Sequence, residues 1–421
     1  MPWLSGLVPC LASGVLVLSL SAVGVVPARS DTRSHEEPGE VRQRAETVVV
    51  APGPARPVAV RGSQERYPAR FTAPYVEGWG SPDVLERARR QWGLSYFTLG
   101  FVISDGGCEG AIDGTMPLAE SEWPAAVARL RAVGGDVIVS LGGGAGTELA
   151  RACASVDDLV DAYRRVVEAF GLPRIDLDIE GPTLQDGAAN ERRNEALARL
   201  QREYAAAGRQ LAVQYTLPTH PHGLSEVGLD LLRDARERGV DVSLVNIMTM
   251  DYGPDLDMGR TAIRAAAGLH GQLAGIWPDR SERQLWAMEG NTPMVGVNDA
   301  VNEVFSTADA AELAAFADEK GIRMLSYWGL GRDRPCPVLG ILAEDCSGTV
   351  QDAGDFARVL RHASTTPPDA PGAAPPQERG SAANFGRPLA PAVLPPAVAA
   401  RRPHPGAAGP GGRPRLSRSA G

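Results

Sequence analysis

The sequence predicts an α/β fold, in the form of a single (β/α)8 TIM barrel, on three observations. Eight short apolar runs that suit buried strands recur between residues 75 and 328 of the 421-residue chain. Amphipathic segments rich in Ala, Arg and Glu separate most of these runs, as crossover helices separate parallel strands. Glycine, which helix C-termini favour, closes helical segments at Gly93, Gly134, Gly171 and Gly321. An open doubly wound sheet is the alternative, but no phosphate-binding glycine pattern follows the first run.

The expected strands and helices follow one another in a regular order. The runs predicted as strands are Tyr75–Trp79, Tyr96–Ile103, Val137–Leu141, Ile175–Ile179, Leu211–Leu217, Val242–Met250, Met294–Val297 and Met324–Trp328. The segments predicted as helices include Pro82–Gln91, Trp123–Val133, Val156–Ala169, Asn190–Ala207, Gly228–Arg238 and Thr307–Lys320. The segment Pro254–Asp279, after the sixth strand, is expected to be a long loop.

Residues 1–28 are predicted to be an export signal, which would make the mature protein secreted and extracellular. Residues Leu11–Val26 are apolar and small, and Val26-Pro27-Ala28 resembles a small-residue cleavage site. No Lys or Arg precedes the apolar run, so a retained anchor helix is the alternative.

Two further segments flank the predicted catalytic domain, which we place at residues 70–362. Residues 29–69 are rich in Arg, Glu, Pro and Gly and are expected to form a disordered linker. Residues 363–421 consist mainly of Pro, Ala and Gly with scattered Arg. Such a composition buries too little apolar surface to fold, so a disordered tail is expected.

Cysteine usage and charge narrow the functional classes. Without the signal, four cysteines are left, and an even number suggests two disulfides in an exported protein. Of the three possible pairings, the local one joins Cys108 to Cys153 and Cys336 to Cys346. No Cys-x-x-Cys occurs and no histidine stands at metal spacing to a cysteine, so a zinc site is not predicted. We expect neither a metal nor a cofactor. The formal charge of −9 argues against nucleic acid as a partner, and we expect a monomer without stable membrane contact.

The stretch Arg174–Glu180 carries the strongest chemical signal. Asp176, Asp178 and Glu180 alternate with aliphatic residues, so a strand would direct three carboxyls to one face at ~6.6 Å spacing. Like charges held so close raise the pKa of at least one of them. A carboxylic acid that stays protonated near neutral pH can act as a general acid. In a barrel, the carboxyl ends of the strands form the active site, and a Gly-Pro pair ends this strand directly after Glu180.

Three other interpretations of this stretch remain open. An exposed edge strand can carry acids outward without any chemistry. A calcium loop would use Asp176, Asp178, Glu180 and Gly181, but its twelfth position, which needs a bidentate Glu, is Gly187. The Asp-x-Asp of metal-dependent sugar-nucleotide transferases also matches the strand.

Small and aromatic residues occupy the ends of other predicted strands. The third strand ends in Ser140-Leu-Gly-Gly-Gly, where small residues let a neighbouring backbone or a substrate come close. The sixth strand ends with Asp251 and Tyr252, which place a carboxyl and a phenol there, and the eighth ends with Trp328. An indole face over a polar cleft suits a pyranose ring, although a large aromatic side chain can also simply fill a core.

Together these segments resemble glycoside hydrolase family 18, the chitinases, and more closely its secreted bacterial branch. The resemblance covers about Pro74–Leu360. It rests on four pieces in this order and at barrel spacing, which are Ser140–Gly143, Asp176–Glu180, Met248–Tyr252 and Trp328. The stretches Thr292–Asn298 and Cys346–Gly348 are also similar to that branch.

The resemblance implies hydrolysis of β-1,4-linked N-acetylglucosamine polymers, chitin or its oligosaccharides, with retention. In that scheme the 2-acetamido group of the substrate is the nucleophile, an exception to the usual two-carboxylate mechanism. Glu180 would protonate the glycosidic oxygen and later activate water. Asp178 would orient the acetamide and Asp176 would tune the charge of Asp178. Stacked acids share protons, so one can be acidic while another stays ionised.

The resemblance also implies substrate-binding residues. Tyr252 and Asp251 would bind the acetamido group or assist Asp178, and Trp328 would form the floor of the sugar subsite where the bond breaks. The remaining members of the predicted substrate-binding set are Gln214, Ser140 and Met250.

Two positions depart from the family pattern. Pro173 stands where the longer acidic motif begins with Asp, which should alter the start of the strand more than its chemistry. Met250 stands at the tyrosine position of the commoner Met-x-Tyr-Asp motif. Because methionine stands at that position, we hypothesise that Tyr252 takes the role of the family's tyrosine.

Three functions are compatible with this pattern. The first is a chitinase, the second is an endo-β-N-acetylglucosaminidase acting on glycans or cell-wall sugars, and the third is an inactive chitin-binding lectin on the same barrel. The presence of Glu180 favours an enzyme, because inactive relatives usually lack the acid. Endo and exo attack are not distinguished by the sequence.

Overall fold

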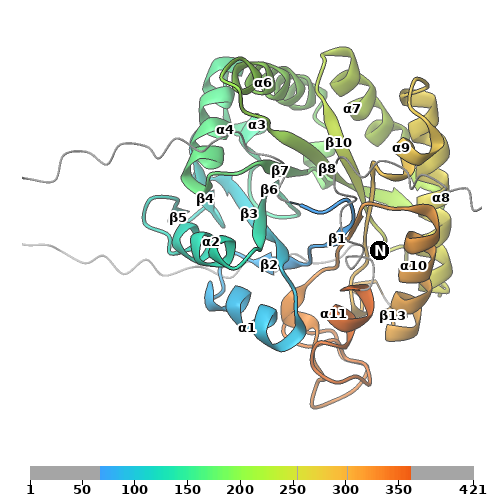
Figure 1. The fold of residues 1–421 in the computed structure, drawn as a ribbon. Helices are drawn as coiled ribbons and strands as arrows, with labels where there is room; N and C mark the ends of the chain where they lie inside the picture. Colours follow the sequence, from blue (N-terminus) through green and yellow to red (C-terminus); the bar gives the residue numbers. More distant parts are fainter. Residues whose placement is uncertain (1–66, 254, 301, 362–421) are drawn as a thin grey trace, which may run out of the picture. The chain divides into compact units, whose positions relative to one another are not determined.

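The structure is a computed structural model and describes residues 67–253, 255–300 and 302–361. Strands and helices alternate through these residues (Figure 1). Contacts divide the chain into two units, Met1–Ala59 and Val60–Gly421, and the described residues all belong to the second. The predicted export signal and tail lie outside the described residues, and the predicted linker reaches them only at residues 67–69. Those boundaries stay predictions.

Eight parallel strand positions close into a barrel. In chain order they are β1 (Phe71–Thr72) with β2 (Tyr75–Glu77), β3 (Tyr96–Ser104), β6 (Asp136–Gly142), β7 (Arg174–Asp178), β8 (Ala212–His220), β10 (Val242–Met248), β11 (Glu289–Thr292) and β14 (Met324–Leu325). Because β2 pairs with β3 and β1 pairs with β14, the first position joins the last. The predicted (β/α)8 barrel is confirmed.

Helices surround this barrel (Figure 1). The longer ones are α1 (Asp83–Trp92), α2 (Trp123–Ala132), α4 (Val156–Phe170), α6 (Gly187–Ala206), α7 (Glu226–Glu237), α8 (Met258–Ile276) and α10 (Thr307–Lys320). The shorter ones are α3 (Leu149–Ala152), α5 (Gly181–Leu184), α9 (Glu282–Trp286), α11 (Asp355–Leu360) and the 3-10 turn η1 (Leu330–Arg332). As predicted, left-handed glycines end α1, α4 and α10, at Gly93, Gly171 and Gly321.

Several short strands lie outside the eight strand positions of the barrel. β4 (Gly110–Ile112) and β5 (Met116–Pro117) extend the sheet beyond β3, and β9 (Gly223–Leu224) pairs with β8. β12 (Gly296–Val297) and β13 (Val304–Phe305) form a separate antiparallel pair. This pair and the loop inside it lie beside the candidate active site.

The prediction of the seventh strand was wrong. The strand is β11, Glu289–Thr292, whereas the predicted Met294–Val297 contributes one bridge from Met294 to Trp328 and the short strand β12. Three of the four residues of β11 are polar and yet buried, and side chains of other elements form hydrogen bonds with each of them. For example, Glu289 lies 3.0 Å from Nδ1 of His270. A search for apolar runs does not find such a strand.

The prediction of a long loop at Pro254–Asp279 was also wrong, because most of this segment is the helix α8. Asp257 caps the helix by accepting a hydrogen bond from Arg260 N at 3.0 Å. Several glycines lower the helix propensity of the segment, but Gly268 has a packing reason. A Cβ there would lie 2.0 Å from the carbonyl oxygen of His222, so glycine lets α8 approach the β8–β9 turn.

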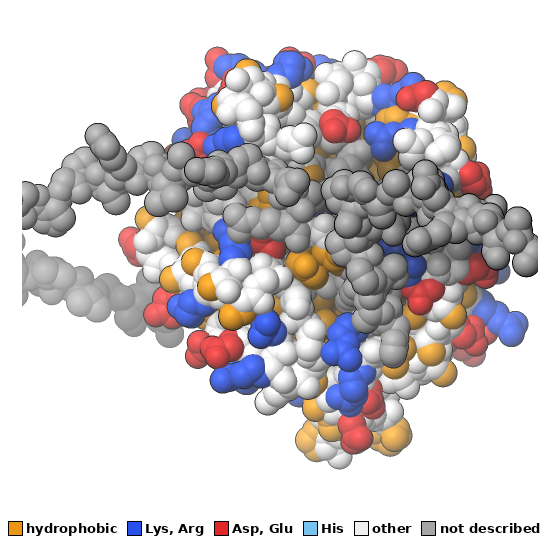
Figure 2. All heavy atoms as spheres, in the orientation of Figure 1, with side chains coloured by type: hydrophobic (Ala, Val, Ile, Leu, Met, Phe, Trp, Pro, Cys, Tyr) orange, Lys and Arg blue, Asp and Glu red, His pale blue; other side chains and the backbone are white. Residues whose placement is uncertain are grey.

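Two disulfides join Cys108 to Cys153 and Cys336 to Cys346, which is the local pairing among the three possible. The second closes a loop with exposed aliphatic side chains, which are Val338, Leu339, Ile341 and Leu342. Figure 2 shows basic and acidic side chains interspersed over one face of the molecule, with hydrophobic ones gathered at its lower end. Within the described part of the chain, no helix is both long and apolar enough to cross a membrane.

Candidate active site

The three acids of the Arg174–Glu180 stretch lie on one side of the backbone, as the alternation predicts. Ile175, Leu177 and Ile179 are completely buried in the apolar core. Asp176 and Asp178 face the barrel interior instead, where they meet side chains of β2, β6 and β8. Glu180 follows the strand in an extended conformation and precedes α5. The acidic face therefore runs from the middle of the barrel to its mouth.

Asp176 is completely buried and is held by four donors. Its Oδ2 accepts hydrogen bonds from Ser140 Oγ at 2.6 Å and from Tyr75 Oη at 3.0 Å. Its Oδ1 accepts from Thr216 Oγ1 at 2.7 Å and from Gln214 Nε2 at 3.1 Å. Burial raises the pKa of Asp176, and the four hydrogen bonds oppose that rise. The Asp176 carboxyl is therefore held in one orientation inside the barrel by these four hydrogen bonds.

The structure places Ser140 and Gln214, which the sequence predicted as substrate-binding residues, beside Asp176 and outside the cavity lining. Neither side chain has any exposed surface, and neither lines the cavity. Both are in register with Asp176 on the two neighbouring strands, β6 and β8, so they lie in its layer of the barrel. Their hydrogen bonds position Asp176, one layer below the mouth.

Asp178 lies one layer higher, beside Glu180. Its Oδ2 is 3.4 Å from Tyr75 Oη, and its Oδ1 is buried without a hydrogen-bond partner among the described residues. Burial, and then the charges of Glu180 and Asp176, raise the pKa of Asp178 well above the ordinary range. Burial also raises the pKa of Glu180, while the hydrogen bond from Asp178 opposes that rise. Two carboxyls this close titrate as a pair, and ionising both at once is unfavourable.

The glycine run after Ser140 lets β6 approach these acids. Gly142 has a φ of 111°, and a Cβ there would lie 2.1 Å from the backbone oxygen of Asp178. Gly143 N donates a hydrogen bond of 2.9 Å to that same oxygen. A Cβ at Gly144 would lie 3.4 Å from a carboxyl oxygen of Glu180. The expected close approach of a neighbouring backbone is confirmed.

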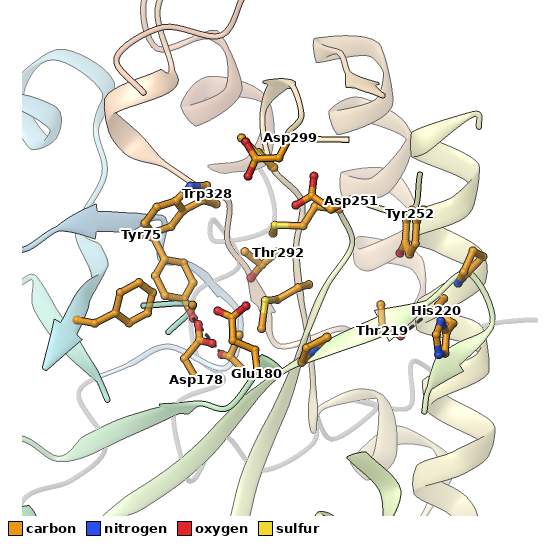
Figure 3. A pocket seen from close by; sticks show the side chains of 18 residues that line it. Tyr75, Asp178, Glu180, Thr219, His220, Asp251, Tyr252, Thr292, Asp299 and Trp328 are labelled. Atoms are coloured by element: carbon orange, nitrogen blue, oxygen red, sulfur yellow. Dashed lines mark hydrogen bonds between the residues drawn. The ribbon is translucent and has the colours of Figure 1, made fainter. Parts of the chain in front are cut away.

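Aromatic rings form one wall of the site (Figure 3). Trp328 stacks on Phe101, with ring centroids 5.8 Å apart and planes 21° apart. It also meets the ring of Tyr75 edge-on at 5.9 Å. Sequence reasoning found Trp328 but missed Tyr75 and Phe101. Their only signal was a position inside predicted strands, although a phenol in a buried run needs a hydrogen-bond partner.

The opposite wall carries the predicted residues of the sixth strand end. Met250, Asp251 and Tyr252 all line the cavity. Figure 3 shows Tyr252 beside Thr219 and His220, across the cavity from Asp178. The phenol that lies at the Asp178 carboxyl is that of Tyr75, and the role of Tyr252, in binding the acetamido group or in assisting Asp178, stays a prediction. The Tyr252 hydroxyl is buried without a hydrogen-bond partner among the described residues.

These walls enclose a cavity of about 570 Å³ at the mouth of the barrel. It has the size that small-molecule sites require. Four carboxyl side chains line it, Asp178, Glu180, Asp251 and Asp299, and its lining contains no Lys or Arg. Across the described residues no cluster of three or more His, Cys, Asp or Glu side chains could hold a metal ion. A parallel barrel with paired carboxyls beside an aromatic wall fits the class of the glycoside hydrolases, which act with paired Asp or Glu residues.

Comparisons with known proteins place the chain within that class. The chain belongs to glycoside hydrolase family 18. The catalytic domain of a hyperthermophilic chitinase from Pyrococcus furiosus is 31% identical, with a TM-score of 0.64 over 71% of this chain and 97% of that one. Mutants of active domain 2 of the Pyrococcus furiosus chitinase, complexed with chito-oligosaccharides, are 30% identical, with a TM-score of 0.63 over 70% and 94% of the two chains.

Curated relatives agree with this assignment, although no family model matches the chain. Endochitinase 11 of Metarhizium anisopliae is 36% identical over 65% of this chain and 55% of that protein. The "Probable bifunctional chitinase/lysozyme" of Escherichia coli (strain K12) is 36% identical over 65% of this chain and 32% of that protein. The chain thus spans about a third to about half of the length of these curated relatives.

Proposed function

We propose that this protein is a secreted glycosidase that hydrolyses β-1,4-linked N-acetylglucosamine polymers, chitin or chitooligosaccharides, with retention by substrate-assisted catalysis. The observation that carries the proposal is the Asp178–Glu180 pair beside the Trp328 wall in one cavity. The relatives named chitinase support the reaction, and the complex with chito-oligosaccharides supports the substrate class. The two disulfides support action outside the cell.

Glu180 is the general acid and base of the proposed reaction. Its proton passes to the glycosidic oxygen as the bond to the anomeric carbon breaks. The carbonyl oxygen of the 2-acetamido group attacks that carbon and closes an oxazolinium ring. The Glu180 carboxylate then removes a proton from a water molecule that attacks the anomeric carbon and reopens the ring. Two successive displacements at one carbon retain its configuration.

Asp178 binds the acetamido N–H in this proposal. Its Oδ1 is a buried acceptor without a partner among the described residues, so a donor from the substrate would satisfy it. As that donor arrives, the proton shared by the pair moves from Asp178 to Glu180. Glu180 then carries the proton that the leaving group needs, and the Asp178 carboxylate stabilises the positive charge that develops on the ring.

Three other groups support this step. Tyr75 Oη lies within hydrogen-bond reach of Asp178 and of Asp176 and stabilises negative charge there. The Trp328 indole, backed by Phe101, offers an apolar face to the pyranose ring. The protein is proposed to act as a monomer and without a cofactor, because these residues of one chain supply the complete set of groups.

A second candidate has specific support. The Escherichia coli relative carries "lysozyme" in its name, so cell-wall sugars or glycoprotein glycans are alternative substrates. Both contain N-acetylglucosamine, and an endo-β-N-acetylglucosaminidase would use the same acids in the same way.

A substrate panel tests the proposal. We expect the wild-type protein to release short oligosaccharides from chitohexaose, as measured by mass spectrometry, at the same rate with and without EDTA. We expect much slower release from peptidoglycan and from an N-linked glycopeptide. Cleavage confined to either of these two substrates would replace chitin by the second candidate. Binding of chitohexaose without any cleavage would identify a lectin, and loss of activity in EDTA would contradict the proposed chemistry.

A further inference from the structure

Two loops at the mouth of the barrel are tied to each other by reciprocal hydrogen bonds. One is the turn of residues 251–253, which follows β10, and the other runs from residue 298 to 303 between β12 and β13. Asp251 Oδ1 accepts a hydrogen bond from Ala300 N at 3.1 Å. In the other direction, Glu303 Oε1 accepts a short hydrogen bond from Gly253 N. Each loop thus provides both a carboxylate and a backbone donor.

Glu303 is the buried member of this pair of carboxylates. The side chain has no exposed surface. Burial raises the pKa of Glu303, and the backbone amides of Gly253, Asp251 and Tyr252 oppose that rise. Glu303 Oε1 accepts a hydrogen bond from Gly253 N, while Oε2 is buried without a hydrogen-bond partner among the described residues. The nearby charge of Asp251 adds to the rise in the pKa of Glu303.

The conformation of both loops requires such support. Asp251 has a φ of 55° and Asn302 a φ of 71°, although neither is glycine. A left-handed conformation of this kind costs about 1–3 kcal/mol and persists only where surrounding contacts hold it. The hydrogen bonds between the loops are among the contacts that hold these conformations, together with the backbone hydrogen bond from Asn298 N to Glu303 O at 3.0 Å within the second loop.

The turn matters because Asp251 and the proposed acid Glu180 line the same cavity. Figure 3 shows Asp251 in the upper part of this cavity, near Asp299, and its charge raises the pKa of Glu180. We propose that Glu303 is a positioning residue, which holds the turn through its hydrogen bond with Gly253 N and so keeps the Asp251 carboxylate in the cavity that it shares with Glu180. This inference rests on the proposed function and assigns Glu303 no contact with substrate.

Other charged and titratable groups surround this unit from the elements packed against it. They are Asp178 beside Glu180, Asp299 and Arg332 beside Asp251, and Arg264 and Tyr252 on the side of Glu303. All of them stay unchanged in the variants that test the inference. A change in kcat or in the pH profile that follows a substitution of Glu303 is then attributed to a movement of the turn of residues 251–253.

A double-mutant cycle tests the inference. We expect Glu303→Ala to lower kcat on chitohexaose about ten-fold and to leave KM within about two-fold, because it misplaces a group beside the reacting bond. In an Asp251→Asn background the same change should cost less than about two-fold, since residues that act through one another are not additive. Glu303→Gln, which keeps an acceptor for Gly253 N, should stay within about three-fold of wild type.

The pH profile gives a second readout. Because the Asp251 charge raises the pKa of Glu180, moving this carboxylate away lowers that pKa. The alkaline limb of the kcat/KM profile should therefore fall at lower pH in Glu303→Ala than in wild type. Glu289→Gln is the control, because it replaces another buried carboxyl, on β11 beside His270. This control should keep both kcat and the alkaline limb.

Several outcomes would overturn the inference. They are an equal loss of kcat from Glu303→Ala in both backgrounds, an unmoved alkaline limb, or the same changes in Glu289→Gln. Should Glu303→Ala not fold, Glu303→Asp, whose shorter side chain withdraws the carboxylate from the turn, enters the same cycle. If the wild type cleaves no oligosaccharide, the proposed function fails separately. The Glu180 carboxyl can still be titrated by 13C NMR in both forms, and an unshifted titration in the variant would contradict the positioning role.

Discussion

Replacing Glu180 with Gln is expected to lower kcat on chitohexaose by about 10³-fold, the middle of the range for general acids. The amide has the shape of the carboxyl but cannot give a proton to the glycosidic oxygen. KM should change little, because the aromatic wall of Trp328 and Phe101 that receives the sugar is untouched. Steady-state kinetics at several pH values measure both constants.

Two controls make this result specific. An aryl glycoside whose leaving group departs without a proton should lose less activity than chitohexaose in the same variant. Glu226→Gln, an exposed position on α7 paired with Arg233, should keep full activity. Equal losses on both substrates, or a kcat within about ten-fold of wild type, would exclude Glu180 as the acid.

Replacing Asp178 with Asn is expected to abolish most of the activity and at the same time to stabilise the fold at neutral and alkaline pH. The carboxylate is expensive to ionise in its buried place beside two other acids, as the raised pKa of Asp178 shows. The Asn side chain cannot ionise, so the variant avoids the free-energy cost of burying this carboxyl, a cost that the fold bears for the sake of activity. We expect kcat to fall at least about 10²-fold, while the midpoint of thermal unfolding rises.

The sign of the pH effect follows from linkage. Because the folded-state pKa of Asp178 lies above that of an unfolded Asp, its contribution to stability is fully present below the ordinary carboxyl pKa. It is lost as the pH rises through the higher folded-state value. The Asp178→Asn variant should therefore gain more unfolding free energy over wild type at pH 8 than at pH 4. A gain independent of pH would contradict this explanation.

Asp176→Asn is the matched comparison on the same strand. Four donors converge on the two oxygens of Asp176, and either orientation of an amide leaves two of them without an acceptor. Buried donors without partners cost about 1–3 kcal/mol, so this variant should be destabilised. If both Asn variants shift the unfolding midpoint in the same direction, the two carboxyls do not differ in the way that their hydrogen bonds indicate.

The sequence predicted the barrel and the acidic strand because both depend on local patterns. Alternating residues in Asp176–Glu180 decide which side chains face inward. Ser140 and its glycines similarly indicated a close approach between strands, and Gly142 provides it. Such features need no knowledge of distant partners.

The remaining parts of the site depend on contacts between distant segments. Tyr75 precedes Asp176 by 101 residues, and only closure of the barrel between β1 and β14 brings its hydroxyl to the acids. The strand β11 was missed because three of its four buried residues are polar and form hydrogen bonds with side chains of other elements. Register, which a one-residue offset would change completely, places Gln214 beside Asp176, to which it donates a hydrogen bond.

The most direct test of the central claim changes the substrate and leaves the protein intact. Fluorine atoms on the acetyl methyl group withdraw electrons from the amide oxygen, so an attack by that oxygen slows with each fluorine added. For aryl glycosides that carry acetyl, fluoroacetyl, difluoroacetyl and trifluoroacetyl amides, we predict that kcat/KM falls steeply along the series. Rates that are equal across the four substrates would show that the amide of the sugar is not the nucleophile, and the proposed roles of Asp178 and Glu180 would be wrong.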